Sequence, residues 1–324
     1  MAWVFTMNVP EIPPSLTIIQ SIQWASDRLK PGPFYNARLD SELILAHVVR
    51  LDRLNLYLNF DQPLTSSERH TFSDLVERRI QGEPVQYLIG FTEFYGRSFI
   101  VSPAVLIPRP ETEILIDYVK PFLERRLQKA PRGPAPQLDL FHVNPTQSVG
   151  PITVVDIGTG SGIIALTLAS ELPGLLYYAS DVSSAALNVA EQNAEQLKLK
   201  GQITFLEGPF MVPLESKLEK SCDLILANPP YITRSEMAQL PDEIRGYEPR
   251  VALDGGEDGL DCYAELVKNA PFFLNSGGML AFEIGADQAD AVTGLFTASQ
   301  LFSNINVVKD YNHLDRVVSA MYTG

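Results

Sequence analysis

Residues 15–82 place apolar side chains at the spacing of amphipathic helices. Three segments, LTIIQSIQWASDRL, ARLDSELILAHVVRL and TSSERHTFSDLVERRIQ, repeat apolar residues every three or four positions. Thr65 or Ser66, followed by Glu68, fits the N-terminus of the third helix. These apolar stripes are most simply the inner faces of a bundle. We therefore predict a small N-terminal helical domain over residues 1–83.

The pattern changes at residue 84. Segment 84–110, PVQYLIGFTEFYGRSFIVSPAVLIPRP, is rich in aromatic and β-branched residues, with Gly90 and Gly96 at turn positions. It predicts a β-hairpin with an extended tail that links two domains. A helix is expected from about Glu111 to Leu127, and a Pro- and Gly-rich insertion then extends to residue 151.

From residue 152 to residue 324, apolar runs alternate with helical patterns. The runs ITVVDIG, LLYYASD, ITFLEG, CDLILAN and GGMLAFEIG are typical of buried strands, with helical segments such as SGIIALTLASELP between them. Strands separated by helices of this length predict βαβ units, and therefore an α/β domain with a doubly wound, mainly parallel sheet. The last run, HLDRVVSAMYTG, is expected to close the sheet as an edge strand.

Composition narrows the classes of function. No run of 18 apolar residues exists, and the N-terminus MAWVFTMNVPEIPP has no pattern of a signal peptide, so we expect a cytoplasmic protein without membrane contact. The two cysteines form no disulfide framework. A net charge of −14 makes direct nucleic-acid binding unexpected, because phosphate neutralisation needs a basic surface. The four histidines are too scattered to predict a metal site.

A glycine-rich loop follows the first strand of the second domain. Its residues are Asp156, Ile157, Gly158, Thr159, Gly160, Ser161 and Gly162. Alternating glycines let a backbone turn tightly and approach a ligand closely. The second strand ends at Asp181, where an acid can hold the ribose hydroxyls of a nucleoside, although Asp181 could instead only cap the following helix. Ile163 breaks the dinucleotide fingerprint, which disfavours an NAD-dependent oxidoreductase.

The run DLILANPPYI ends a buried strand with Asn228, Pro229, Pro230 and Tyr231. If this is the fourth strand, it lies beside the first, at the point where strand order reverses and ligands bind. Prolines keep the preceding residues extended and donate no N–H, so the turn is stiff. The Asn228 side-chain oxygen and a neighbouring backbone carbonyl then form a pair of acceptors suited to a planar –NH₂ group, and Tyr231 is a candidate wall of that pocket.

These motifs resemble those of known methyltransferases. D-x-G-x-G-x-G resembles motif I of class I S-adenosylmethionine-dependent enzymes, and NPPY resembles the signature of enzymes that methylate planar nitrogens. Together with GEPVQYLIGFTEFYGRSFIVSPAVLIPRPETE and YEPRVALDGGEDGL, they resemble the release factor glutamine methyltransferase family (PrmC/HemK). The resemblance covers roughly residues 15–128 and 152–322.

The resemblance implies a seven-stranded class I methyltransferase domain and N5-methylation of the glutamine in the GGQ loop of class 1 peptide chain release factors. It implies a monomer whose N-terminal bundle recognises the substrate. S-Adenosyl-L-methionine would contact Gly158, Thr159, Gly160, Ser161, Gly162, Asp181, Phe210 and Asn228. The substrate amide would be held by Asn228 and the Pro229 backbone, with Pro230 and Tyr231 completing the pocket; Asn228, Pro229 and Tyr231 would be the catalytic residues.

One position departs from the family pattern. Pro209 stands where members usually carry an acid that accepts from the adenine amino group, so Glu207 is a candidate substitute and Phe210 can still stack on adenine. A weaker affinity for the cofactor is expected. A methyltransferase for a ribosomal-protein glutamine, an N6-adenine nucleic-acid methyltransferase and a non-catalytic module remain alternatives. Glu283, at the end of a strand, is a candidate for a supporting role.

Overall fold

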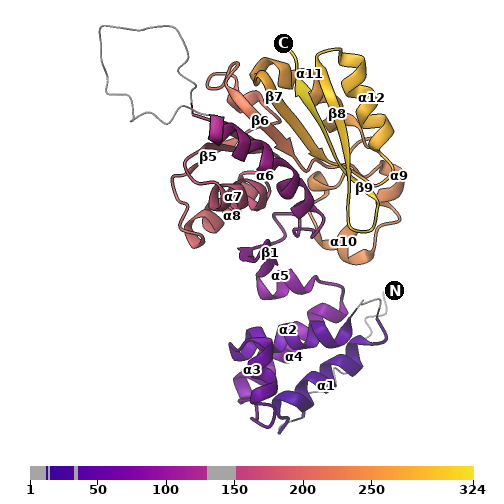
Figure 1. Cartoon of the computed structure of the whole chain (residues 1–324). Coiled ribbons are helices and arrows are strands. Elements are labelled where there is room, and N and C mark those ends of the chain that lie inside the picture. The colour runs from indigo at the N-terminus through magenta and orange to yellow at the C-terminus, as the bar shows by residue number, and fades with distance from the viewer. Residues whose placement is uncertain (1–11, 14, 33–35, 130–150) are drawn as a thin grey trace. The chain divides into compact units, whose positions relative to one another are not determined.

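A computed structural model describes residues 12–13, 15–32, 36–129 and 151–324 (Figure 1). The chain divides into two compact units, one of residues 1–91 with 241–247 and one of residues 92–240 with 248–324. Part of the predicted insertion, residues 130–150, lies outside the described residues. No helix of the described part is long and apolar enough to cross a membrane.

The first unit is the predicted helical bundle. Its helices are α1 (Ile18–Leu29), α2 (Ala37–Val49), α3 (Arg53–Leu58), α4 (Ser66–Ile80), α5 (Val85–Ile89) and α10 (Asp242–Tyr247). Thr65 caps α4 in a capping box with Glu68, as the sequence predicts. Buried Ile22, Ile44 and Phe72 bring α1, α2 and α4 together in one apolar core.

Two features of this unit differ from the sequence-based prediction. A short helix, α5, replaces the first part of the expected hairpin, because Val85, Leu88 and Ile89 are buried in the bundle core. Burial in the core outweighs the strand preference of these residues. The boundary between the units therefore falls at residue 91 rather than 83. In addition, α10 contributes to this unit from far along the chain: Arg79 donates to Glu243, with 3.0 Å between Nη2 and Oε2.

The hairpin itself is present, as β1 (Phe91–Phe94) and β2 (Arg97–Ile100). The second unit continues with α6 (Thr112–Lys129), β3 (Thr153–Ile157), α7 (Ile163–Glu171), β4 (Leu176–Asp181), α8 (Ser184–Gln196), β5 (Ile203–Glu207), η1 (Val212–Leu214), β6 (Cys222–Ala227), α9 (Arg234–Met237), η2 (Arg250–Ala252), α11 (Asp261–Phe273), β7 (Leu274–Glu283), α12 (Ala289–Ser299), β8 (Phe302–Lys309) and β9 (Asp315–Tyr322).

The sheet of the second unit has seven strands in the order β5-β4-β3-β6-β7-β9-β8. The strands from β5 to β7 are parallel, whereas β9 runs antiparallel to both of its neighbours. Helices α6 and α7 pack in the core on one face, and α11 and α12 pack in the core on the other (Figure 1). This is the predicted doubly wound α/β arrangement, and strand order reverses between β3 and β6.

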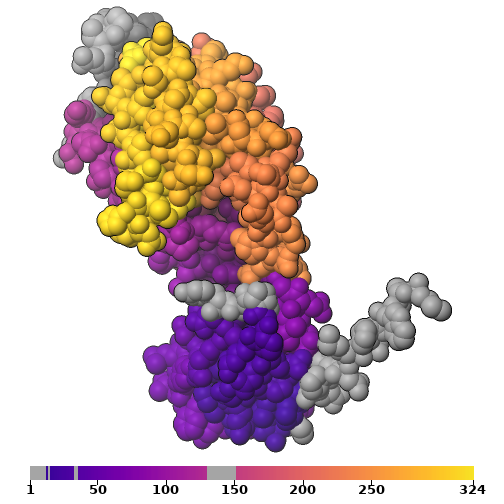
Figure 2. Space-filling model, turned by 90° about the vertical axis from the view of Figure 1, so that its right-hand side faces the viewer, coloured from indigo at the N-terminus to yellow at the C-terminus, as the bar shows by residue number. Residues whose placement is uncertain are grey.

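The expectation that the last strand closes the sheet is wrong. Strand β9 lies inside the sheet with mostly buried residues, and the edge is formed by β8, which the apolar pattern did not reveal. Most β8 side chains are half-buried or exposed, and the C-terminal part of the chain forms a continuous area of the surface (yellow in Figure 2).

Candidate active site

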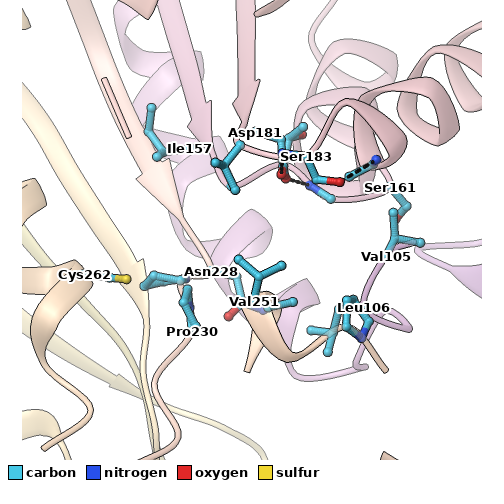
Figure 3. Close-up of a pocket in the computed structure, with 18 of the residues that line it drawn as sticks. Val105, Leu106, Ile157, Ser161, Asp181, Ser183, Asn228, Pro230, Val251 and Cys262 are labelled. Atoms are coloured by element: carbon cyan, nitrogen blue, oxygen red, sulfur yellow. Dashed lines mark hydrogen bonds between the residues drawn. The ribbon is translucent and has the colours of Figure 1, made fainter. Parts of the chain in front are cut away.

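A cavity of about 330 Å³ opens at the carboxyl ends of the central strands. Strand pairing explains its position, because Ile157 of β3 pairs with Ala227 of β6, so the residues that follow, Gly158 and Asn228, leave the sheet side by side. Its lining includes Leu106, Arg109, Thr112, Gly158, Thr159, Gly160, Ser161, Asp181, Pro209, Phe210, Asn228, Pro229, Pro230 and Val251. Figure 3 shows Asp181 and Ser183 on one side of this cavity and Asn228 and Pro230 on the other. The predicted cofactor and substrate residues, Gly162 and Tyr231 excepted, therefore meet in one cavity.

The glycine-rich loop follows a backbone path that requires glycine. Gly158, Gly160 and Gly162 have φ values of 71°, 56° and 82°. No atom lies within 4 Å of a Cβ built on Gly158 or Gly160, so their bare backbone borders open space. A Cβ on Gly162 would lie 2.7 Å from Cδ1 of Leu166, so this glycine serves the packing of α7. The first two glycines thus leave room for a ligand.

Asp181 fixes the loop to the end of β4. Its Oδ2 accepts a hydrogen bond from the Gly160 N–H at 2.9 Å, and its Oδ1 accepts from the Ser183 N–H at 2.9 Å (Figure 3). The N-cap of α8 is Ser183, whose hydroxyl accepts from the Ala186 N–H. Asp181 is therefore more than a helix cap, since its carboxylate also lines the cavity. Each oxygen retains a lone pair for a ligand hydroxyl.

Asp156 supports the loop from beneath, a role that the sequence did not reveal. This fully buried carboxyl accepts from the Thr159 hydroxyl at 2.6 Å and from the Ala165 N–H at 3.2 Å. Burial raises the pKa of Asp156 to about 7, although both hydrogen bonds oppose that shift. A single carboxyl thereby ties the loop to the first turn of α7.

The Asn-Pro-Pro turn forms the opposite wall of the cavity. Asn228, Pro229 and Pro230 line it, and the Asn228 Nδ2 donates to the Thr112 hydroxyl at 3.2 Å. Tyr231 is not among the lining residues; its half-buried ring packs against the core beneath α11 and α12, and burial raises the pKa of its phenol. The Tyr231 carbonyl accepts from Gln288 Nε2 at 3.1 Å. Tyr231 thus anchors the turn and does not form part of the cavity wall.

A second segment, residues 253–260, braces this turn through backbone contacts. The Ile232 N–H donates to the Leu253 carbonyl at 3.0 Å, and the Gly255 N–H donates back to the Ile232 carbonyl at 2.9 Å. A Cβ on Gly255 would lie 2.7 Å from Cα of Tyr231, so only glycine fits there. This contact explains why a chain with the NPPYI turn also carries the glycine-rich segment LDGGEDGL. Neither segment, read alone, indicates that the two are in contact.

The loop before α6 is held by a buried acid. Glu248 accepts from the Ile107 N–H at 3.2 Å and from Arg109 Nη2 at 2.5 Å. Leu106 and Arg109 thereby become part of the cavity wall. Sequence reasoning missed Glu248 because its partners lie about 140 positions earlier in the chain.

The position of the expected adenine contact is occupied by Pro209, which lines the cavity together with Phe210. Phe210 has a φ of 47°, and its carbonyl accepts from the Ser180 hydroxyl at 3.1 Å. Glu207 is exposed and is not among the residues that line the cavity. The loop as described therefore gives no support to Glu207 as a substitute acceptor. Within the described part of the chain, no three His, Cys, Asp or Glu side chains gather as a metal site.

The sheet order, the glycine loop and the acid at the end of the second parallel strand define a class I S-adenosylmethionine-dependent methyltransferase. Residues 141–242 match the methyltransferase small domain, and residues 20–90 match the PrmC N-terminal domain. The fold is similar to that of the hMettl16 catalytic domain, at 15% identity and a TM-score of 0.51, covering 77% of this chain and 82% of that one.

Curated relatives define the family more closely. The chain is 39% identical to release factor glutamine methyltransferase of Geobacter sulfurreducens, over 95% of this chain and 98% of the relative. It is 40% identical to that of Moorella thermoacetica (93% and 97%) and 37% identical to that of Bacillus subtilis (94% and 98%). The chain belongs to the release factor glutamine methyltransferase family.

Proposed function

We propose that this protein transfers a methyl group from S-adenosylmethionine to the side-chain nitrogen of the glutamine in the GGQ loop of class 1 peptide chain release factors. The observation that carries this proposal is a single cavity with a cofactor-type glycine loop on one side and the Asn228–Pro230 turn on the other. Family membership supports the identity of the substrate.

The residues present fit the cofactor. The cavity, at about 330 Å³, lies in the range of small-molecule sites. The bare backbone at Gly158 and Gly160 admits a ligand, and Asp181 has lone pairs for ribose hydroxyls. We assign cofactor binding to these residues with Thr159, Ser161, Phe210 and Asn228, whereas Gly162 packs against α7. When bound, S-adenosylmethionine supplies an electrophilic methyl group on a sulfonium.

Asn228 and the turn after it supply the positioning of the nucleophile. An amide nitrogen is a poor nucleophile because its lone pair is delocalised into the carbonyl. The Asn228 oxygen and the Pro229 carbonyl accept hydrogen bonds from the substrate –NH₂, fix its direction and stabilise positive charge as it develops on nitrogen. Orientation of this kind supplies up to roughly 7–11 kcal/mol in favourable cases. Pro230 and Tyr231 stiffen and anchor the turn.

The acceptor pair also predicts selectivity. A glutamate carboxylate in place of the glutamine would have no N–H to donate, and the acceptors would be left facing its negative charge. An unpaired buried acceptor costs about 1–3 kcal/mol. We infer that a GGE sequence is not a substrate, and that the N-terminal helical unit recognises the release factor outside the GGQ loop.

The test compares Asn228→Ala with the wild-type chain. We expect turnover with a purified class 1 release factor to fall by at least 100-fold, while circular dichroism shows an intact fold. Methyl transfer at near-wild-type rates would contradict the assigned role of Asn228. Label on double-stranded DNA in place of the release factor would contradict the proposed substrate.

A further inference from the structure

The proposed reaction requires one of two orientations of the Asn228 carboxamide. An asparagine side chain presents an oxygen at one end and an –NH₂ group at the other. Only the oxygen can accept from a substrate amide, so the nitrogen has to face the protein. In the structure the nitrogen does so, because Asn228 Nδ2 donates to Thr112 Oγ1 at 3.2 Å. Thr112 is fully buried at the start of α6.

A buried carboxyl group lies on the same side of Asn228. Glu283 is the last residue of β7, which lies beside β6. Ala227 of β6 pairs with Phe282 of β7, so the residues that follow them, Asn228 and Glu283, are neighbours. Its side chain is 1% exposed, and its Oε2 has no hydrogen-bond partner among the described residues. Burial raises the pKa of Glu283 to about 7, whereas the Thr112 and Asn228 side chains, as hydrogen-bond donors to Glu283, favour its ionised form.

We propose that Thr112 and Glu283 are positioning residues that hold the Asn228 carboxamide with its oxygen toward the substrate amide, an inference that rests on the function proposed above. A carboxylate oxygen accepts and cannot donate. The Thr112 hydroxyl donates its proton to Glu283, so its oxygen has only lone pairs left for Asn228. Rotation of the carboxamide by 180° would bring its oxygen against those lone pairs and the Glu283 carboxylate, and would aim –NH₂ at the substrate –NH₂. The pair therefore selects the productive orientation before substrate binds.

The same two residues contribute to the choice of substrate. Above pH 7, where Glu283 is ionised, its negative charge lies behind Asn228 and adds to the repulsion that a carboxylate substrate meets in the cavity. Glutamine, which brings a neutral –NH₂, meets no such penalty. Thr112 and Glu283 thereby extend the recognition of the amide from the turn at Asn228 into the helix α6 and the strand β7.

If Thr112 and Glu283 only stabilise the fold, their substitution should have a different effect on turnover. A set of paired substitutions separates this structural role from the positioning role. Thr112→Val and Glu283→Leu remove the polar contacts, whereas Thr112→Ser and Glu283→Gln keep an acceptor at each position. Thr167→Val is the matched control, since Thr167 is a fully buried threonine of α7 whose hydroxyl has no partner in the described structure. Each change is made in the full chain, with and without Asn228→Ala.

We expect Thr112→Val to lower kcat for release factor methylation about 2- to 10-fold and Glu283→Leu about 10- to 100-fold, as the loss of a neutral and a charged hydrogen bond predicts. The affinity for S-adenosylmethionine, measured by calorimetry, stays unchanged. Thr112→Ser, Glu283→Gln and Thr167→Val remain close to wild type. In the Asn228→Ala background, Thr112→Val and Glu283→Leu cause no further loss.

Losses that multiply in the Asn228→Ala background, or equal losses for Val and Ser at position 112, would overturn the inference. A wild-type chain that transfers no methyl group to the release factor would overturn the proposed function instead. A second measurement needs no substrate: the ¹⁵N side-chain amide signal of Asn228 is expected to exchange with solvent slowly. Thr112→Val speeds that exchange if the inference holds, and unchanged exchange would also overturn it.

Discussion

Gly255→Ala tests whether the brace on the Asn-Pro-Pro turn matters for catalysis. The added Cβ would lie 2.7 Å from Cα of Tyr231, 2.8 Å from its carbonyl carbon and 2.9 Å from the Pro230 oxygen. All three are backbone atoms, so no side-chain rotation relieves the clash. Ordinary contact begins at 3.4 Å, so the turn has to move by about 0.7 Å. The substrate acceptors at Asn228 and Pro229 move with it.

The expected result follows from the sensitivity of transfer reactions to geometry. A misplacement of about 1 Å can cost on the order of 100-fold in rate, so we expect kcat to fall roughly 10- to 100-fold. Overpacking of this kind also costs about 1–3 kcal/mol of stability. The affinity for S-adenosylmethionine should change little, because Asp181 lies across the cavity from Asn228 and Pro230 (Figure 3).

The assay measures kcat with a release factor, cofactor affinity by calorimetry and unfolding in urea. Gly294→Ala is the matched control, because Gly294 lies in α12 and a Cβ there meets no atom within 4 Å. That variant should keep full activity and gain stability, as alanine does in a helix. Wild-type kcat in Gly255→Ala would refute the idea that the 253–260 segment positions the turn.

Three further predictions concern Asp181 and Pro209, on the cofactor side of the cavity, and the buried carboxyl group of Glu283. Asp181→Ala should weaken S-adenosylmethionine binding about 10- to 100-fold, because the Gly160 and Ser183 N–H groups lose a charged acceptor; unchanged affinity by calorimetry would contradict this role. Pro209→Asp should strengthen cofactor binding about 2- to 10-fold by restoring an acceptor near the adenine, and a weaker affinity would argue against that placement. Burial raises the pKa of Glu283 from 4.5 to about 7, so its contribution to stability is present below pH 4.5 and is lost as the pH rises through 7. Urea denaturation should therefore show that Glu283→Gln becomes more stable relative to wild type by up to roughly 3 kcal/mol between pH 5 and pH 8, whereas a difference independent of pH would contradict the raised pKa.

The parts of the site that the sequence predicted are local in the chain. A glycine loop after a strand, an acid at the end of the next strand and an asparagine before two prolines each signal their role within a few residues. The reversal of strand order then brings these three segments together, because Ile157 pairs with Ala227. The position of the cavity and most of its candidate residues could therefore be predicted.

The remainder of the site depends on contacts between distant segments. Thr112 reaches Asn228 across 116 positions, and Gly255 is required only because the backbone of Tyr231 lies against it. We expected Tyr231 in the cavity wall, but its ring packs against the apolar core instead. The amino-acid sequence around these residues carries no local pattern that predicts any of these contacts.

Two elements of the fold escaped prediction for related reasons. Residues 85–89 have the composition of a strand, and only their burial in the helical bundle makes them a helix. Strand β8 is an edge strand with few buried positions, and its register shifts between Ser303 and Asn306, where Asn304 has a φ of 49°. This irregularity breaks the alternation of apolar and polar residues by which strands are recognised.

The most direct test of the account is methyl transfer from labelled S-adenosylmethionine to a purified class 1 release factor, followed by tandem mass spectrometry of the GGQ peptide. We expect one methyl group on the side-chain nitrogen of the glutamine, and none on a release factor whose GGQ glutamine is replaced by glutamate. Label on a different residue, or equal label on the glutamate variant, would contradict it.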